Sequence, residues 1–220
     1  MWDLAECPAD QKPIGCGWVF RIKYKADGTV ERYKARLVAK GFAQKPHLDY
    51  TETFAPVAKF ASLRTIIAVA AMEDLELDSM DISSAFLNGD LDEEIYMSQP
   101  EGFAVPGKEH LVCRLKKSLY GLKQSPRQWY QKLNETFMQL GFRRIQSDNC
   151  IYVWAKDGLR IMIPVFVDDL TLAATGRPLM DSIKAELQRK FKMRDLGLAL
   201  YLGHPGDPRP LQTPHLSISG

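Results

Sequence analysis

Alternating apolar and basic residues predict a β-hairpin near the start of the chain. The alternation covers residues 18–25 and has the two-residue period of a β-strand. A turn is expected at 26–29, which contains Gly28, and a return strand is expected over 30–39. Basic side chains gather on one side of this hairpin, namely Arg21, Lys23, Lys25, Arg32, Lys34 and Arg36.

Three helices are predicted from apolar residues at helical spacing. Over 60–72, apolar residues recur at positions i, i+3, i+4 and i+7. A second helix is expected over 125–140, with Ser125 as its N-cap and Gly141 at its end. A third is expected over 178–192. Each helix should turn one apolar face toward a core.

The remaining apolar runs predict an antiparallel sheet. One strand is expected to end near Asp81, and two more should cover 150–155 and 160–167. Asp168 and Asp169 follow the last of these, and a further strand returns from them. The pattern therefore predicts an α+β fold with helices on one face of an antiparallel sheet.

The composition allows one sizeable core or two modest ones, and the net charge indicates no partner. The chain has 220 residues, 45% of them apolar, and a formal charge of +2. Basic residues are concentrated instead: 21–45 holds eight against two acids, and 114–132 holds six and no acid. Such runs are usually solvated faces, but they also suit phosphate groups. The acidic stretch 90–94 is expected to lie in solvent.

The cysteines and the apolar runs indicate an intracellular protein. The four cysteines form no CxxC pair, and no histidine lies beside them at zinc-ligand spacing, which is typical of reduced thiols. The first residues lack the apolar stretch of a signal peptide, and no apolar run approaches the ~20 residues that span a bilayer. We therefore expect neither secretion nor a membrane span.

Two adjacent carboxylates, Asp168 and Asp169, interrupt a long apolar β pattern. One interpretation is a plain two-residue turn whose acids lie in water. The other keeps the hairpin but places its tip in a cleft, where paired like charges are costly unless a divalent cation neutralises them. Mg²⁺ prefers one or two carboxylates together with substrate phosphates. The pair alone leaves both interpretations open.

Asp81 supplies a third carboxylate from a distant segment. An Asp at a strand end is more often a cap or turn residue. Two metal ions about 4 Å apart, however, need carboxylates from two different segments. Asp81, Asp168 and Asp169 together therefore form a candidate two-metal centre, which would activate a primer 3′-hydroxyl and hold a triphosphate.

Several spaced motifs resemble those of reverse transcriptases from copia-type LTR retrotransposons. AFLNGD after Asp81, SLYGLKQSPRQWY at 118–130 and FVDDL at 166–170 occur in the order of that family's first three palm motifs. The segment KPIGCGWVFRIKYKADGTVERYKARLVAKGFAQ is similar to its fingers, and DYTETFAPVAKFASLR and MRDLG also match. The resemblance covers roughly residues 2–203.

The resemblance implies a right-hand polymerase fold and RNA-directed DNA polymerase activity. Residues 1–75 would form the fingers, and 76–203 a palm with an antiparallel sheet and an interleaved fingers segment at about 90–125. The cofactor implied is a pair of Mg²⁺ ions, for which Mn²⁺ could substitute. The partners implied are an RNA or DNA template with its primer and deoxynucleoside triphosphates. The expected location is a cytoplasmic particle or the nucleus.

The resemblance also gives roles to individual residues. Asp81, Asp168 and Asp169 correspond to the metal-binding triad. Phe86 corresponds to a ring that excludes a ribose 2′-hydroxyl, although the residues alone favour a core aromatic there. The nucleotide-binding candidates are Ala85, Phe86, Tyr120, Gly121, Lys23, Lys25, Lys34 and Arg36. The template–primer candidates are Lys123, Ser125, Arg127, Phe166 and Val167. Lys190 and Lys192 are further candidates, either as proton donors to pyrophosphate or as plain helix C-terminal cations.

Two questions remain open in the sequence. The register of the hairpin is ambiguous by one step, so the cation that contacts the triphosphate is not identified. After MRDLG the chain departs from the family pattern, and four prolines over 204–220 predict an irregular tail without a primer-grip hairpin or thumb. RNase H and integrase regions are not part of the sequence.

Two alternatives to an active polymerase follow. A decayed, truncated remnant would keep the fold and nucleic-acid binding but no catalysis. Another Asp-pair nucleotidyltransferase would require the fingers and GLKQSP matches to be coincidental.

Overall fold

The computed structural model describes residues 1–25, 27–199, 201–202 and 209–210. The chain forms two compact units, and each is assembled from two segments of the sequence. Unit 1 comprises Met1–Pro56 and Ser84–Gly141, and unit 2 comprises Val57–Ser83 and Phe142–Gly220. Each unit has its own sheet and its own buried residues, so each is described by itself.

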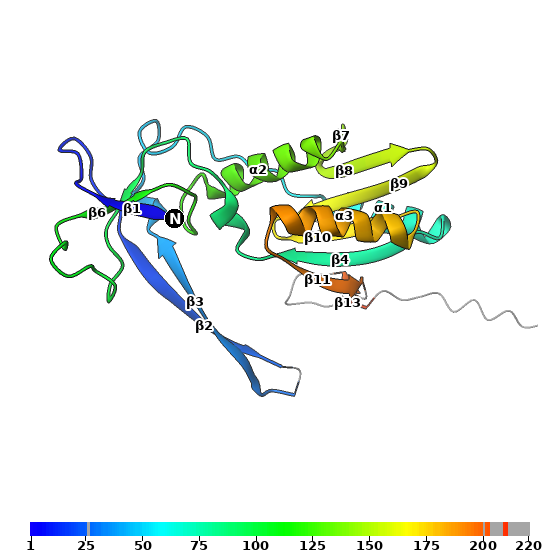
Figure 1. Ribbon diagram of the computed structural model, residues 1–220, viewed down its shortest axis with the longest axis horizontal. Helices are drawn as coiled ribbons and strands as arrows, with labels where there is room; N and C mark the ends of the chain where they lie inside the picture. Colours follow the sequence, from blue (N-terminus) through cyan, green and yellow to red (C-terminus); the bar gives the residue numbers. More distant parts are fainter. Residues whose placement is uncertain (26, 200, 203–208, 211–220) are drawn as a thin grey trace, which may run out of the picture. The chain divides into compact units, whose positions relative to one another are not determined.

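A long two-stranded hairpin extends from the rest of unit 1 (Figure 1). β2 (Cys16–Tyr24) pairs antiparallel with β3 (Val30–Ala39), as the alternation predicts. Directly opposite residues lie on the same face of a ribbon. The register pairs Ile22 with Tyr33 on one face and Arg21 with Lys34 on the other. Tyr33 is 78% exposed, so even the apolar face of this ribbon is open to solvent near its tip.

The base of the hairpin is anchored where backbone meets backbone. The Ala39 N–H donates a hydrogen bond of 2.7 Å to the Tyr120 carbonyl oxygen. A Cβ added at Gly121 would lie 2.1 Å from the Ala39 oxygen, and one added at Gly41 would lie 2.0 Å from the Gly121 oxygen. Gly121 also has a φ of +91°, which glycine adopts without strain. Only glycine therefore fits at positions 41 and 121, where the backbone segments lie this close together.

Short elements complete unit 1. A three-stranded antiparallel sheet has the order β1 (Trp2–Ala5), β6 (Val112–Leu115), β5 (Tyr96–Met97). Unit 1 also contains two 3₁₀ helices, η1 (Gly41–Ala43) and η2 (Ala85–Asn88), and the helix α2 (Ser125–Gln139). The sequence pattern did not predict these strands, because segments of two to four residues are too short to show a period.

Helix α2 confirms the predicted second helix but corrects its start. Trp129, Leu133 and Phe137 are buried, as the spacing requires. The N-cap residue is Gln124, and no side chain caps the helix. Ser125 is the first helical residue and is fully buried, and its hydroxyl donates to the Leu119 carbonyl oxygen over 2.6 Å. The expectation that Ser125 is the N-cap is therefore wrong.

Unit 2 is organised around a six-stranded sheet in which all neighbours are antiparallel (Figure 1). The strand order is β11-β4-β10-β9-β8-β7. The strands are β4 (Glu76–Ile82), β7 (Arg143–Ile145), β8 (Asp148–Lys156), β9 (Leu159–Phe166), β10 (Asp169–Ala174) and β11 (Met193–Leu198). The predicted antiparallel sheet is confirmed, and β4 lies between two strands that follow it late in the chain.

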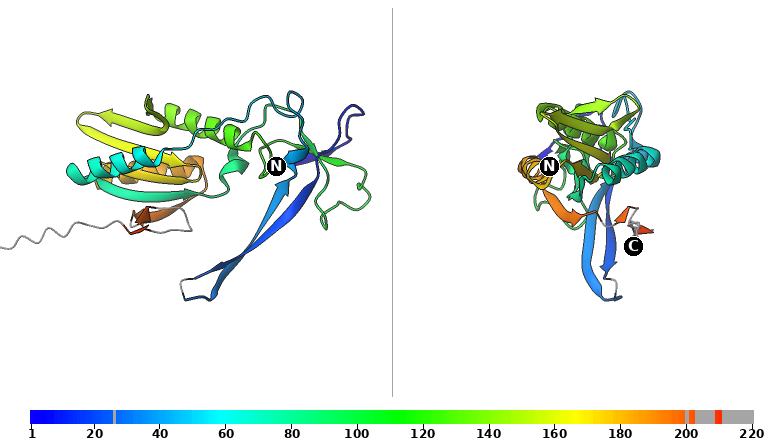
Figure 2. Two further views of the ribbon diagram at one scale, coloured as in Figure 1. Left: turned by 180° about the vertical axis from the view of Figure 1, so that it is seen from behind. Right: turned by 90° about the vertical axis from the view of Figure 1, so that its right-hand side faces the viewer.

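Helices cover both faces of this sheet, where the sequence predicted one. α1 (Phe60–Met72) lies on one side and α3 (Arg177–Lys190) on the other (Figure 2). Ile66 and Ala70 of α1 pack with Ile151 and Ala173 of the sheet. Helix α3 buries Met180, Ile183 and Leu187. The strands between these two helices are buried on both faces. Packing against both helices therefore fixes the distances between neighbouring strands.

The N-terminus of α1 is held by a side chain from a distant part of unit 2. Asp148 is 5% exposed and accepts hydrogen bonds from the Lys59 N–H (2.9 Å) and the Cys150 N–H (3.0 Å). Burial raises the pKa of Asp148, but these hydrogen bonds, one from Ser62 and the Lys59 charge together lower the pKa below its usual value. Asp148 thus supplies the cap that the residues at the helix start do not provide.

The remaining expectations concern the thiols, the tail and membranes. All four cysteines are free, and burial raises the pKa of Cys113 to about 11 and that of Cys150 to about 12. Of the predicted irregular tail the structure describes only β13 (Arg209–Pro210), which pairs antiparallel with β12 (Tyr201–Leu202). No helix in the described part of the chain is long and apolar enough to cross a membrane.

Candidate functional site

The sheet of unit 2 brings two of the three predicted metal-binding carboxylates face to face. Asp81 of β4 and Asp169 of β10 are direct partners in the antiparallel register. Directly opposite residues have Cα atoms about 4.5–5.5 Å apart and point to the same side of the sheet. The Ile82 N–H also donates to the Asp168 carbonyl oxygen over 2.8 Å. Asp81 and Asp169, 88 positions apart in the sequence, are thus joined by strand pairing.

The third carboxylate lies in the turn between β9 and β10. Phe166 pairs with Asp169, so Val167 and Asp168 form a two-residue connection. Val167 has a φ of +59°, a left-handed conformation that costs a β-branched residue about 1–2 kcal/mol. The sequence predicted a turn made by the two aspartates. In the structure the turn lies one residue earlier, at Val167 and Asp168, and Asp169 is the first residue of β10.

The carboxylates are partly or fully exposed, and Arg194 lies beside Asp81. Asp168 and Asp169 are exposed, and the Asp81 side chain is 26% exposed. Arg194 of β11 is the direct partner of Asp81 on its other side, and its Nη2 lies 3.5 Å from the Asp81 Oδ2. Arg194 was not predicted as a site residue. Its place in MRDLG gave no signal, because only the register of β11 on β4 brings it to Asp81.

The donor set fits a hard divalent cation in kind, though the side chains do not yet converge on one point. All three candidates offer carboxylate oxygens, the ligand type that Mg²⁺ and Mn²⁺ prefer. Among the residues that the structure describes, no group of three His, Cys, Asp or Glu side chains has the spacing of a formed metal site. The backbone places Asp81 beside Asp169, and rotation of their side chains would be needed to direct the carboxylate oxygens to one point.

The register of the hairpin in unit 1 resolves which cations share a face. Arg36 lies opposite Val19, Lys34 opposite Arg21, and Arg32 opposite Lys23. All five of these basic residues therefore project from one side of the ribbon. Lys25 follows β2 and closes the turn, with its N–H donating to the Thr29 carbonyl oxygen over 2.8 Å.

Three nucleotide-binding candidates form a cluster in unit 1. The rings of Phe86 and Tyr120 meet edge to face, with centroids 5.4 Å apart. The guanidinium carbon of Arg36 lies 5.6 Å from the centre of the Tyr120 ring, within the range of a cation–π contact. Phe86 is half-buried, and Ala85 beside it is buried. A basic residue of the hairpin is thereby placed beside two aromatic rings that the sequence singled out separately.

The other candidates are distributed over both units. In unit 1, Lys123 is exposed and Arg127 half-buried, whereas the buried hydroxyl of Ser125 offers no surface to a nucleic acid. In unit 2, the ring of Phe166 lies 6.1 Å from that of Phe60, close to the Val167 turn. Lys190 and Lys192 are exposed, and the Lys192 carbonyl oxygen accepts from the Ser83 N–H over 2.9 Å. The structure brings Arg194, rather than either lysine, to Asp81.

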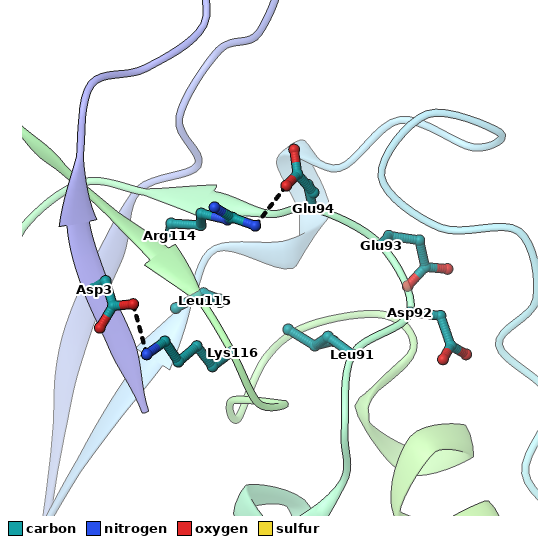
Figure 3. Close-up of a pocket in the computed structure, with 8 residues that line it drawn as sticks. All are labelled: Asp3, Leu91, Asp92, Glu93, Glu94, Arg114, Leu115 and Lys116. Atoms are coloured by element: carbon teal, nitrogen blue, oxygen red, sulfur yellow. Dashed lines mark ion pairs between the residues drawn. The ribbon is translucent and has the colours of Figure 1, made fainter.

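A pocket of about 390 Å³ in unit 1 contains none of the predicted site residues (Figure 3). Its lining is mainly charged and includes two ion pairs, Asp3–Lys116 at 2.6 Å and Glu94–Arg114 at 2.8 Å. The acids of 90–94 were expected to lie in solvent, and Asp90, Asp92 and Glu94 are exposed. Asp92 and Glu93 in addition accept hydrogen bonds from Gln128 and Gln124 at the start of α2. This acidic segment therefore helps to fix α2 within unit 1.

Comparisons with known proteins identify the family of the chain. A family model described as "Reverse transcriptase (RNA-dependent DNA polymerase)" matches residues 1–204. The chain is 46% identical over 200 residues to the retrovirus-related Pol polyprotein from transposon TNT 1-94 of Nicotiana tabacum. The matched region covers 90% of the chain and 15% of that protein. The chain is 40% identical over 195 residues to the Pol polyprotein from transposon RE1 of Arabidopsis thaliana, covering 88% of the chain and 13% of that protein.

The likeness extends beyond plants. The Ty1-MR1 Gag-Pol polyprotein of Saccharomyces cerevisiae is 30% identical over 178 residues, or 79% of the chain and 10% of that protein. The chain belongs to the reverse transcriptase (RNA-dependent DNA polymerase) family, and the resemblance to copia-type retrotransposon enzymes is confirmed. It spans about one seventh of the length of the TNT 1-94 polyprotein.

Proposed function

We propose that this chain is the fingers and palm of a reverse transcriptase and that it adds deoxynucleotides to a primer on an RNA or DNA template. In this proposal, unit 2 contains the palm sheet and unit 1 contains the fingers hairpin. The observation that carries it is the pairing of Asp81 with Asp169 across β4 and β10, with Asp168 in the adjoining turn. Strand pairing of this kind supplies carboxylates from two segments, as two-metal phosphoryl transfer requires.

The residues of unit 2 would hold the catalytic metal ions. Asp81 and Asp169 would each contribute a carboxylate from the sheet, and Asp168 would contribute one from the turn. A pair of Mg²⁺ ions, or Mn²⁺ in their place, would supply the positive charge that activates a 3′-hydroxyl and stabilises the leaving pyrophosphate. Phe166 and Val167 flank these acids and would contact the template–primer duplex.

The residues of unit 1 would bind and orient the nucleotide. The basic face of the hairpin offers Lys23, Lys34 and Arg36 to the triphosphate, since phosphate oxygens are bound mainly by Lys, Arg and backbone N–H groups. Arg36 is the strongest of these candidates, because it already lies against Tyr120. The Phe86 ring, packed edge-on to Tyr120, would crowd a ribose 2′-hydroxyl and so favour deoxynucleotides. Lys123 and Arg127 would bind template phosphates.

Further partners follow from the relatives. The proteins that match are Pol and Gag-Pol polyproteins of transposons, and the chain spans a small part of each. We propose that the chain works together with other polyprotein regions, including RNase H and integrase.

The proposal is tested by primer extension on an oligoribonucleotide template with Mg²⁺ and the four deoxynucleotides. The parent chain should extend the primer, and Asp169→Asn should lower the rate by about 10³-fold, since it removes one of the two opposed carboxylates. Asp181→Asn is the matched control, because Asp181 is an exposed acid of unit 2 on α3. A parent chain that binds primer–template but never extends it would support the decayed remnant instead.

A further inference from the structure

A partly buried ion network joins three elements of unit 2. Lys184 of α3 donates from Nζ to Asp78 of β4 and to both carboxylate oxygens of Asp195 in β11, at 2.8 and 2.9 Å. Arg177, at the start of α3, donates to the same Asp78 oxygen over 2.7 Å and to Glu76 over 2.6 Å. The side chains of Lys184 and Asp78 are only 7% and 1% exposed. The other members of the network, Asp195, Arg177 and Glu76, have side chains that are 41%, 44% and 42% exposed. Lys184 thus bridges the neighbouring strands β4 and β11 from the face of the sheet that α3 covers.

Stability alone is a poor reason for such a network. Removing charges from water is costly, and a buried ion pair can often be replaced by apolar residues without loss of stability. Asp78 adds to the cost, because its Oδ1 is buried and has no hydrogen-bond partner within the described part of the chain. Charged hydrogen bonds instead fix the relative positions of the groups that they join, because they tolerate little change in geometry.

The network acts on the strand that positions Arg194. The register of β11 on β4 shifts between Asp195 and Gly197, which marks a β-bulge. The Gly197 N–H donates to Asp195 Oδ1 over 2.9 Å, and Gly197 has a φ of +69°. Side chains alternate between the two faces of a strand. Holding Asp195 toward Lys184 therefore directs its neighbour Arg194 to the opposite face, where Arg194 meets Asp81.

The pKa shifts of Lys184 and Asp195 agree with an ion pair between them. Burial lowers the pKa of Lys184, but its hydrogen bonds to Asp195 and Asp78 outweigh burial and raise the pKa above its usual value. Burial raises the pKa of Asp195, but the hydrogen bonds from Lys184 and the Gly197 N–H lower the pKa overall. Both groups are therefore charged throughout the neutral range.

We propose that Lys184 is a positioning residue for Asp81. By holding Asp78 and Asp195 together, it fixes the offset between β4 and β11, and with it the position of Arg194 beside the Asp81 carboxylate. Asp78 precedes Asp81 by three residues, about 10 Å along a strand, so Lys184 acts through the backbone and does not touch substrate. The inference rests on the proposed catalytic role of Asp81.

The test compares Lys184→Met with Leu187→Ala. Leu187 is fully buried on the same helix and takes no part in the network, so its truncation destabilises α3 through packing alone. Both variants are assayed below their unfolding temperatures, at matched fractions of folded protein. The readouts are the turnover rate for primer extension, the Mg²⁺ concentration that gives half the maximal rate, and amide hydrogen exchange in β11.

Lys184→Met should lower the turnover rate about tenfold, raise the half-saturating Mg²⁺ concentration about fivefold and speed exchange at Arg194 and Asp195. Leu187→Ala should leave the half-saturating Mg²⁺ concentration unchanged, and Lys184→Arg should restore most of the rate. The inference is overturned if Lys184→Met and Leu187→Ala give the same Mg²⁺ dependence and rate. A parent chain that extends no primer would instead overturn the proposed function, and the positioning role with it.

Discussion

The acidic centre of unit 2 and the basic hairpin of unit 1 are positioned by different means. Asp81 and Asp169 lie on paired strands of a sheet that is packed between two helices, so buried residues on both faces fix their separation. The cations of the hairpin project from a two-stranded ribbon that is open on both faces and anchored at its base.

The difference matches the chemistry that each region would perform. Metal ligands must hold distances within a few tenths of an ångström, which requires a rigid support. Long Lys and Arg side chains can reach phosphate oxygens from a range of backbone positions. A rigid sheet therefore suits the acids, whereas an exposed ribbon suffices for the cations.

The largest expected effect is a loss of the rate of nucleotide addition when a carboxylate of unit 2 is removed. Asp81→Asn should reduce the single-turnover rate of nucleotide addition by about 10³-fold, because one opposed carboxylate is lost, and should leave primer–template affinity unchanged. Rapid-quench kinetics and fluorescence anisotropy measure the two quantities. An affinity loss with a normal rate would reverse the assignment of roles.

The next effect concerns the anchor of the hairpin. Gly121→Ala should destabilise the protein by about 3 kcal/mol, since the new Cβ meets the Ala39 carbonyl oxygen and the backbone has a positive φ. Gly28→Ala is the matched control, because Gly28 has a φ of +82° but open space around it, and should cost about 1 kcal/mol. Urea denaturation measures both, and equal losses would show that the close approach is not needed.

A smaller effect tests how the unit 2 core holds α1. Asp148→Ala should cost about 1–2 kcal/mol, because it removes the hydrogen bonds at the helix N-terminus. The pKa of Asp148 is lower in the folded than in the unfolded chain, so its contribution is complete above the unfolded pKa of about 4. It is lost as pH falls from there through the folded pKa. Denaturation of parent and variant from pH 6 to pH 3 should therefore converge at the acid end, and a constant gap would contradict this.

The smallest effect belongs to a single cation of the ribbon. Lys23→Gln should weaken primer–template binding only a few-fold and reduce the slope of log affinity against log salt by about 1. Asp181→Asn should leave that slope unchanged. If Lys23→Gln also left the slope unchanged, the basic face of the hairpin would not contact phosphates.

Long periodic segments of the fold were predictable from the sequence, because periodicity reflects burial. The hairpin, the three helices and the strands that flank the Asp pair all follow from it. The strands of two to four residues in unit 1 were not, since they carry too few residues to show a period. The second covered face of the unit 2 sheet was also missed, because the pattern does not say on which side a helix packs.

The candidate site was predictable only in part. Asp168 and Asp169 stood out as candidates, since adjacent acids inside an apolar run are conspicuous, and Asp81 became a candidate only when it was considered together with them. The placement of Arg194 beside Asp81 depends on a register that includes a bulge, which no local pattern encodes. The turn at Val167 was also hidden, because a β-branched residue at positive φ is the opposite of what turn preferences suggest.

The central claim is that Asp81 and Asp169, paired across β4 and β10, bind divalent metal together. Titration with Mn²⁺, followed by the electron paramagnetic resonance of the free ion, tests it directly in the presence of primer–template and a nucleotide that cannot be incorporated. We expect Asp81→Asn and Asp169→Asn each to weaken Mn²⁺ binding at least about tenfold relative to the parent and to Asp181→Asn, a loss of about 1.4 kcal/mol or more. Parental Mn²⁺ affinity in both variants would contradict it.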